Sequence, residues 1–77
     1  EKEMKRKEYN IDGYLIYEGE YLYGEINGKG KEYDWHSGEL IFEGEYLNGK
    51  RWNGKEKEYD YNGRLVFKGE YLNGEIN

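Results

Sequence analysis

Apolar and polar residues alternate along three segments of the chain, in the pattern of a β-strand that buries one face. In the middle segment, residues 40–47, one face carries Leu40, Phe42, Gly44 and Tyr46. The other face carries Ile41, Glu43, Glu45 and Leu47. The corresponding apolar rows of the other two segments are Leu15, Tyr17, Gly19, Tyr21 and Leu65, Phe67, Gly69, Tyr71. This spacing predicts strands with one packed face and one mostly hydrated face.

Shorter and more polar segments, residues 29–35 and 55–61, precede two of these strands and alternate in the same way. The turns expected inside the hairpins are Asp12-Gly13, His36-Ser37-Gly38 and Asn62-Gly63. Glycine-containing turns between alternating segments indicate β-hairpins. Connections between successive hairpins are expected at Asn27-Gly28, Asn48-Gly49, Asn53-Gly54 and Asn73-Gly74.

The hairpins form an internal repeat. The tetrapeptide Gly-Glu-Tyr-Leu occurs at residues 19–22, 44–47 and 69–72, at intervals of 25 residues, and Trp52 reads as a one-residue insertion. An isolated hairpin is marginal in water, so the units are expected to stack. The predicted fold class is all-β: a single-layer antiparallel meander of three stacked β-hairpins, about six strands, of the repeat or solenoid type. The units fall at approximately 1–24, 25–49 and 50–77.

Two further rows recur in every unit. Gly19, Gly44 and Gly69 interrupt the strands, where glycine is unfavourable. We expect them to make room for a neighbouring ring, for instance from Tyr33 or Tyr59; the alternative is close approach of a ligand backbone. The second row, Glu20, Glu45 and Glu70, is expected to form a solvated charged face, with Lys on the intervening strands between the carboxylates.

Composition and charge narrow the function. The net charge is −5, which argues against nucleic acid as a partner and makes membrane binding an unlikely role. The chain has no Cys, so it has neither disulfides nor thiolate metal ligands and shows no sign of an oxidising compartment; a cytoplasmic location is expected. Its single histidine, His36, is placed in an exposed turn, which leaves almost nothing for a catalytic triad or a histidine metal site. We therefore expect no enzyme activity and no cofactor.

The segment 42–55, Phe-Glu-Gly-Glu-Tyr-Leu-Asn-Gly-Lys-Arg-Trp-Asn-Gly-Lys, resembles the membrane occupation and recognition nexus (MORN) repeat. Tyr46 stands where that repeat most often has Trp, and Glu56 replaces the second Gly of its Gly-x-Gly pair. The resemblance implies a single-layer meander that acts in scaffolding, self-association or the binding of a peptide or helix along a groove. It also implies two alternatives, an antitoxin-like binding protein of bacteria and a membrane-surface or phosphoinositide-associated module. Since neither end carries a distinct capping unit, we expect a fragment of a longer array, or a chain that closes its edges by association.

The predicted function is that of a non-enzymatic repeat scaffold. It would bind a protein partner, a helix or an extended peptide, through an aromatic-lined sheet face, or would self-associate through its sheet edges. The alternative for the aromatic residues is that they form the intramolecular core. The candidate partner-binding residues are Tyr21, Tyr33, Trp35, Tyr46, Tyr59 and Tyr71.

Overall fold

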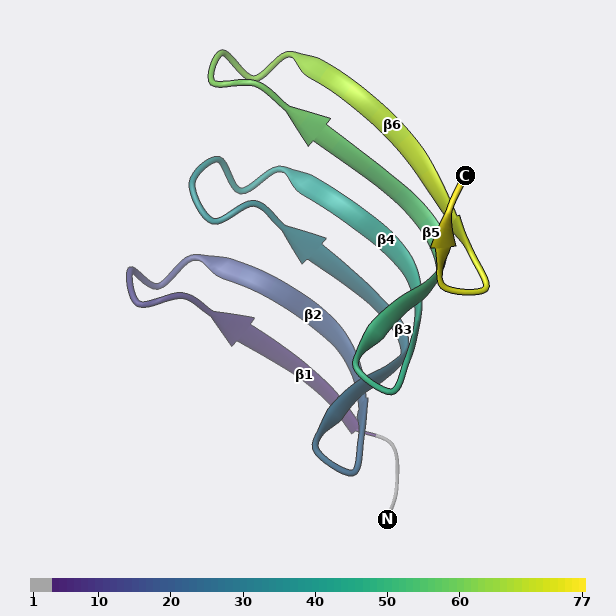
Figure 1. Ribbon diagram of the computed structural model, residues 1–77. Coiled ribbons are helices and arrows are strands. Elements are labelled where there is room, and N and C mark those ends of the chain that lie inside the picture. Colours follow the sequence, from purple (N-terminus) through teal and green to yellow (C-terminus); the bar gives the residue numbers. More distant parts are fainter. Residues whose placement is uncertain (1–3) are drawn as a thin grey trace.

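A computed structural model describes residues 4–77 of the protein and shows a single open sheet of antiparallel strands in sequence order (Figure 1). The predicted all-β meander is confirmed. The strands are β1 (Met4–Tyr9), β2 (Leu15–Leu22), β3 (Glu25–Tyr33), β4 (Leu40–Leu47), β5 (Lys50–Tyr59), β6 (Leu65–Leu72) and the short β7 (Glu75–Ile76). The Cα atoms span 42 × 33 × 12 Å, so the molecule is one layer thick.

Tight turns join the strands at both ends of the sheet. The turns at Asp12-Gly13, His36-Ser37-Gly38 and Asn62-Gly63 lie where the sequence predicts them (Figure 1). They are stacked above one another at one end of the strands. An acidic or amide side chain supports each of these turns. The Asp34 carboxylate, for example, accepts hydrogen bonds from the backbone N–H groups of His36 and Ser37 at 2.8 and 3.0 Å.

The connections between hairpins differ in part from those expected. Asn48-Gly49 and Asn73-Gly74 are turns, as expected, but Asn27-Gly28 lies inside β3 and Asn53-Gly54 inside β5. The chain turns instead at Tyr23-Gly24, which the sequence analysis did not predict. Both residues have positive φ, 52° and 80°. Positive φ at both central positions is the geometry that lets a two-residue turn join twisted strands. Position along the repeat therefore selects this turn, although tyrosine rarely adopts such a conformation.

The expected insertion at Trp52 is a β-bulge. Tyr46 pairs with Arg51 and Glu45 pairs with Asn53, which leaves Trp52 as the extra residue between them. The side chain of Trp52 lies against the next turn, where a Cβ on Gly74 would come within 3.1 Å of its ring.

The core lies on one face of the sheet and consists of tyrosine and phenylalanine rings. Tyr17, Tyr21, Phe42 and Tyr46 are at most 7% exposed, on the face that the alternation predicts. Neighbouring rings, including that of Tyr71, meet edge to face with centroids 5.3–5.7 Å apart, so that one row of rings crosses β2, β4 and β6. This arrangement suits the quadrupoles of aromatic rings and links the repeats.

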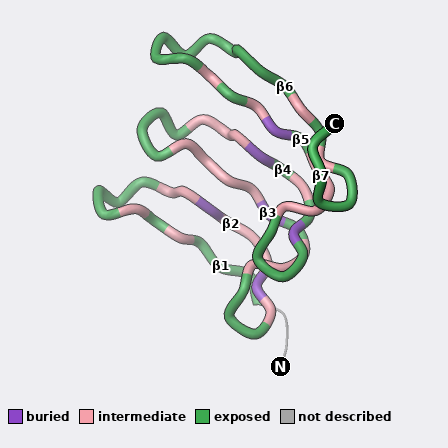
Figure 2. Tube along the Cα trace, in the orientation of Figure 1, coloured by how far each residue is buried: buried purple, intermediate pink, exposed green. Residues whose placement is uncertain are grey.

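The third repeat is less buried than the first two. Phe67 is 39% exposed, whereas its counterpart Phe42 is 1% exposed. Figure 2 shows buried positions (purple) on β2, β4 and β5, and a mostly exposed β6. The cause is the position of β6 near the edge of the sheet, because the pairing with β7 involves only Tyr71 and Leu72.

Two of the three strand glycines leave room for a ring, as expected, but the source of the rings differs from the expectation. A Cβ added to Gly19 would collide with Tyr17, and one added to Gly69 would lie 2.8 Å from the ring of Phe67, so each ring comes from two positions earlier on the same strand. A Cβ on Gly44 would instead meet the backbone of Asn53 and Gly54. Tyr33 and Tyr59 do not fill these spaces.

A partly buried ion network joins the second and third repeats. The Arg51 guanidinium donates two hydrogen bonds to the Glu32 carboxylate, at 2.8 and 3.0 Å, and a third to Glu56. Tyr46 donates its hydroxyl to Glu32 at 2.8 Å, and the guanidinium lies over the ring of Phe42, 4.6 Å from its centroid. Burial opposes ionisation of Glu32, but the bonds from Arg51 and Tyr46 outweigh it and lower the pKa of this carboxyl below 4.5.

This network separates the roles of two buried tyrosines. Tyr46→Phe is expected to lower the free energy of unfolding by about 2 kcal/mol, because it removes a hydrogen bond to a charged group. Tyr21→Phe is the matched control, since within residues 4–77 the buried hydroxyl of Tyr21 has no hydrogen-bond partner; this change should be neutral or stabilising. Urea unfolding followed by circular dichroism measures both, and equal losses would contradict the role of the Glu32 bond.

Candidate binding channel

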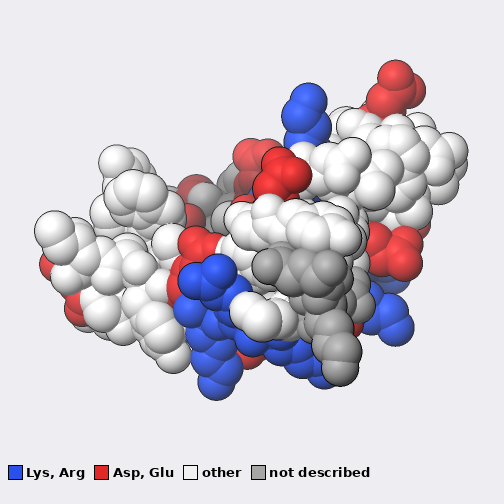
Figure 3. All heavy atoms as spheres, turned by 90° about the horizontal axis from the view of Figure 1, so that it is seen from below, with Lys and Arg blue, Asp and Glu red and all other residues white. Residues whose placement is uncertain are grey.

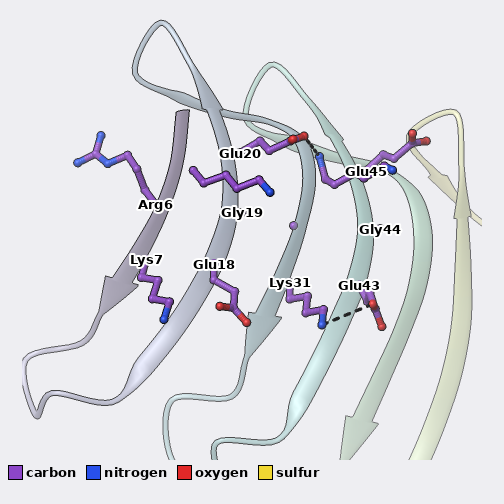
Figure 4. A pocket seen from close by; sticks show the side chains of 12 residues that line it. Arg6, Lys7, Glu18, Gly19, Glu20, Lys31, Glu43, Gly44 and Glu45 are labelled. Carbon is purple, nitrogen blue, oxygen red and sulfur yellow. Dashed lines mark hydrogen bonds and ion pairs between the residues drawn. The ribbon is translucent and has the colours of Figure 1, made fainter. Parts of the chain in front are cut away.

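The face opposite the rings carries a channel that runs across the strands (Figure 4). Its volume is about 970 Å³. Charged residues form its two walls, and backbone forms its floor. The wall residues are Lys5, Lys7, Glu18, Glu20, Lys29, Lys31, Glu43 and Glu45. We call this feature the charged channel.

The floor of the charged channel is bare backbone because residues between the two wall rows direct their side chains to the opposite face of the sheet. Gly19 pairs with Gly30, and Gly30 pairs with Gly44, so glycines lie side by side on three neighbouring strands. On β1, Arg6 pairs with Gly19 of β2. The Arg6 guanidinium turns to the other face of the sheet, where it lies 4.8 Å from the centroid of the Tyr21 ring. A Cβ on Gly19 or Gly30 would likewise point to the ring face, toward Tyr17, so the floor stays open at glycine and arginine alike.

Charge alternates from strand to strand along both walls. One wall follows the ladder Lys7, Glu18, Lys31, Glu43, in which each residue pairs directly with the next. The walls together hold four Lys and four Glu, so the charged channel is neutral although the whole chain carries −5. Seen along the stack in Figure 3, Lys and Arg (blue) gather on one side of the molecule, with Asp and Glu (red) among them. A neutral, alternating surface does not favour a polyanion such as nucleic acid.

Two of the four carboxylates of the charged channel are held in place by hydrogen bonds. Glu18 accepts a hydrogen bond from the Tyr33 hydroxyl at 2.6 Å, and Glu20 accepts one from the backbone N–H of Lys29 at 2.7 Å. The bond to Glu18, together with burial, raises the pKa of Tyr33 to about 12. These two acceptors therefore keep fixed positions.

The lysines are less constrained. Lys31 lies 3.8 Å from Glu43, and both side chains are about half exposed, so this pair contributes little to stability. Within residues 4–77, Lys5, Lys7 and Lys29 form no ion pair. Their ammonium groups are available to a partner that brings acceptors to the channel.

The structure does not bring the six predicted partner-binding residues onto one surface. Tyr21 and Tyr46 are core residues, 7% and 5% exposed, which favours the core alternative for them. Tyr71 is partly buried against that core, and Tyr33 reaches Glu18 in the charged channel. The remaining two residues lie outside both the core and the charged channel. Tyr59 is half-buried at the end of β5, and Trp35 is 64% exposed.

Trp35 was expected at the end of a strand but lies in the turn after β3. Ile11 and Tyr61 occupy the same position in the other two hairpin turns and are fully exposed. The three turns thus present a row of apolar side chains at one end of the strands, apart from the charged channel.

Within residues 4–77, no group of three or more His, Asp or Glu side chains could hold a metal ion. The same residues contain no helix with the length and apolar character needed to cross a bilayer.

Comparisons of the chain with protein-family models, with curated proteins and with solved structures find no match. The resemblance to the MORN repeat therefore rests on the residues quoted above.

The channel residues were visible in the sequence but were assigned to a solvated face. Glu20 and Glu45 belong to a row that the repeat identifies, and the intervening Lys residues were expected between them. The missing information was the register, which sets Lys opposite Glu and glycine opposite glycine in adjacent strands. Only pairing of the strands converts these rows into two walls and a floor.

Proposed function

We propose that the protein is a non-enzymatic repeat scaffold that binds a segment of a protein partner in the charged channel. The observation that supports this most is the combination of an open backbone floor with walls of fixed carboxylates and free ammonium groups. A polypeptide segment can carry both signs of charge, whereas a metal ion, a nucleic acid or an anionic lipid surface carries one. The proposal moves the binding surface away from the aromatic face, because protein already covers Tyr21 and Tyr46.

Selection from a displayed library of random peptides tests the proposal. We expect enriched peptides to bind the 77-residue chain and to lose at least fivefold in affinity for the double variant Lys31→Gln/Glu43→Gln. This variant removes one charge of each sign from the channel wall and leaves the net charge unchanged. Failure to enrich any peptide, or unchanged affinity for the variant, would contradict binding in the channel.

A matched control addresses the other exposed surface. Trp35→Ala removes the largest side chain of the apolar turn row and touches no wall of the channel. Affinity for the enriched peptides should be unchanged. A loss confined to Trp35→Ala would place binding at the turns instead.

Self-association is a second candidate, and it is favoured by the outer side of β6. Within residues 4–77, no strand pairs with residues 65–69 on that side, and Phe67 is partly exposed there. Open strand edges invite pairing, although an edge lysine such as Lys68 opposes it. Sedimentation over a wide concentration range tests this candidate, and a monomer at every concentration would contradict it.

A further inference from the structure

The charge on the channel walls changes sign at every strand. β1 places Lys on both walls, β2 places Glu, β3 again Lys, and β4 again Glu. Paired strands lie ~4.8 Å apart, so the sign reverses every ~4.8 Å and repeats every ~9.6 Å along the channel. We call these four strand-wide groups the charge bands.

An α-helix can match this spacing along one face. Residues three or four apart lie ~4.5–6 Å apart along a helix, and seven residues span ~10.5 Å. Over the three steps between four bands, alternating charges at these positions drift by only ~1–2 Å from the bands. The flexible lysine side chains can absorb such a drift.

Extended segments do not match. Residues on one face of a β-strand lie ~6.7 Å apart, so three steps drift by ~6 Å and bring like charges together. In a polyproline II segment, residues on one side repeat every ~9.3 Å, and they meet bands of a single sign. The charge bands therefore discriminate between conformations of a bound segment.

From this spacing we infer that the occupant of the charged channel is an α-helix whose contact face alternates Lys or Arg with Asp or Glu at every third or fourth residue. The inference rests on the proposed function and specifies its partner. The bound helix sets its acidic side chains against the ammonium groups of Lys5, Lys7 and Lys29 and its basic side chains against the fixed carboxylates of Glu18 and Glu20.

A second copy of the same face has the same band spacing but a poorer shape. Two such faces would set wall against wall, and their glycine floors would then enclose a gap. Close packing disfavours this arrangement. A helix about 10–12 Å across rests on the side chains of both walls, which stand ~6.7 Å apart as every second residue of each strand. The helix is accordingly the occupant that the charge spacing favours.

Two synthetic helical peptides of identical composition test the inference. In the alternating peptide, Glu and Lys follow one another at three- and four-residue spacing on one face. In the block peptide, all Lys of that face precede all Glu. Both are cross-linked to hold the helix, and circular dichroism checks that their helicity is equal. By fluorescence anisotropy at low salt, the alternating peptide is expected to bind at least tenfold more tightly, and this preference should shrink as salt screens the charges.

A band-reversal variant adds a test of register. Lys29→Glu/Lys31→Glu turns the positive β3 band negative, and we expect at least a tenfold loss in affinity for the alternating peptide. Changing the one Glu of the peptide that faces this band to Lys should restore binding. The control variant Lys50→Glu/Arg64→Glu changes the net charge equally at residues outside the channel walls and should bind as the original chain does. Thermal unfolding checks that both variants fold.

The outcomes separate this inference from the proposed function. Equal affinity for the two peptides, or no restoration by the swapped peptide, would overturn the charge bands as a helix-recognition device. If the random library still yields channel-dependent peptides, the proposed function stands without the helix. A dimer that blocks peptide binding and is abolished by band reversal would show that a second copy is the occupant.

Discussion

Replacing Gly44 by valine is expected to leave the chain unfolded. Even the Cβ of an alanine at this position would collide with the carbonyl oxygen of Asn53 and would lie 2.5 Å from the Cα of Gly54. These are backbone atoms of β5, which cannot move aside without breaking the β4–β5 ladder. Overpacking alone costs about 1–3 kcal/mol, and loss of the ladder would add to it. A domain of this size has a total stability of only about 4–12 kcal/mol.

A graded comparison measures the effect in a chain that still folds. Gly44→Ala should cost about 3 kcal/mol or more. At Gly38 nothing lies within 4 Å of an added Cβ, and only the positive φ of 76° opposes alanine. That strain is about 1–2 kcal/mol. Urea unfolding of the two variants should rank Gly44→Ala well below Gly38→Ala, and the reverse order would contradict the close approach of β4 and β5.

Removal of the Arg51 guanidinium is the second change with a large expected effect. Arg51→Met leaves the partly buried carboxylate of Glu32 and the buried carboxylate of Glu56 without their cation. Breaking a buried ion pair by removing one partner costs about 3–5 kcal/mol, and because the Glu32 side chain is 29% exposed we expect a loss of about 3 kcal/mol. The control is Arg64→Met, whose ion pair with Asp60 is 3.7 Å long and mostly exposed. This control should change the free energy of unfolding by less than about 1 kcal/mol.

The contribution of Glu32 to the pH dependence of the free energy of unfolding should reverse in sign in Arg51→Met. In the unchanged chain the folded-state pKa of Glu32 is lowered, so its contribution is present above about pH 4.5 and is lost as the pH falls through the folded-state pKa. Without Arg51, burial dominates and raises that pKa, so the variant gains stability as the pH falls toward 4.5. Urea unfolding at several pH values measures the two slopes. Parallel slopes would contradict the role of Arg51, and Glu32→Gln should partly rescue the variant at neutral pH.

The strands, their packed face and most of the turns were predictable because they depend on local pattern. Alternation placed Tyr17, Phe42 and Tyr46 on one packed face, since every second residue of a strand shares a face, but the assignment of Tyr46 to partner binding was wrong because the ring is buried. The expected turn at Asn27-Gly28 was wrong because that pair has the composition of a turn but lies inside a strand of the stacked sheet. Tertiary pairing outweighed local propensity there.

The ion network could not be anticipated from spacing. Arg51 and Glu32 are on different strands and in different repeats, and β4 lies between them. The two side chains meet because β5 pairs with β4 through a bulge at Trp52, a register that no local pattern specifies. The channel walls were anticipated in part: Lys was expected between the Glu residues, but the register that pairs each Lys with a particular Glu was not.

The amino-acid order alone established a repeating all-β chain with one aromatic and one charged face, because a two-residue period is a property of each strand taken singly. The arrangement of the charged face into bands above a glycine floor, and the enclosure of Arg51 among aromatic rings, were decided by the folded sheet. Both depend on which residue of one strand lies opposite which residue of the next. That register is set by bulges, turns and ring packing acting together across the whole molecule.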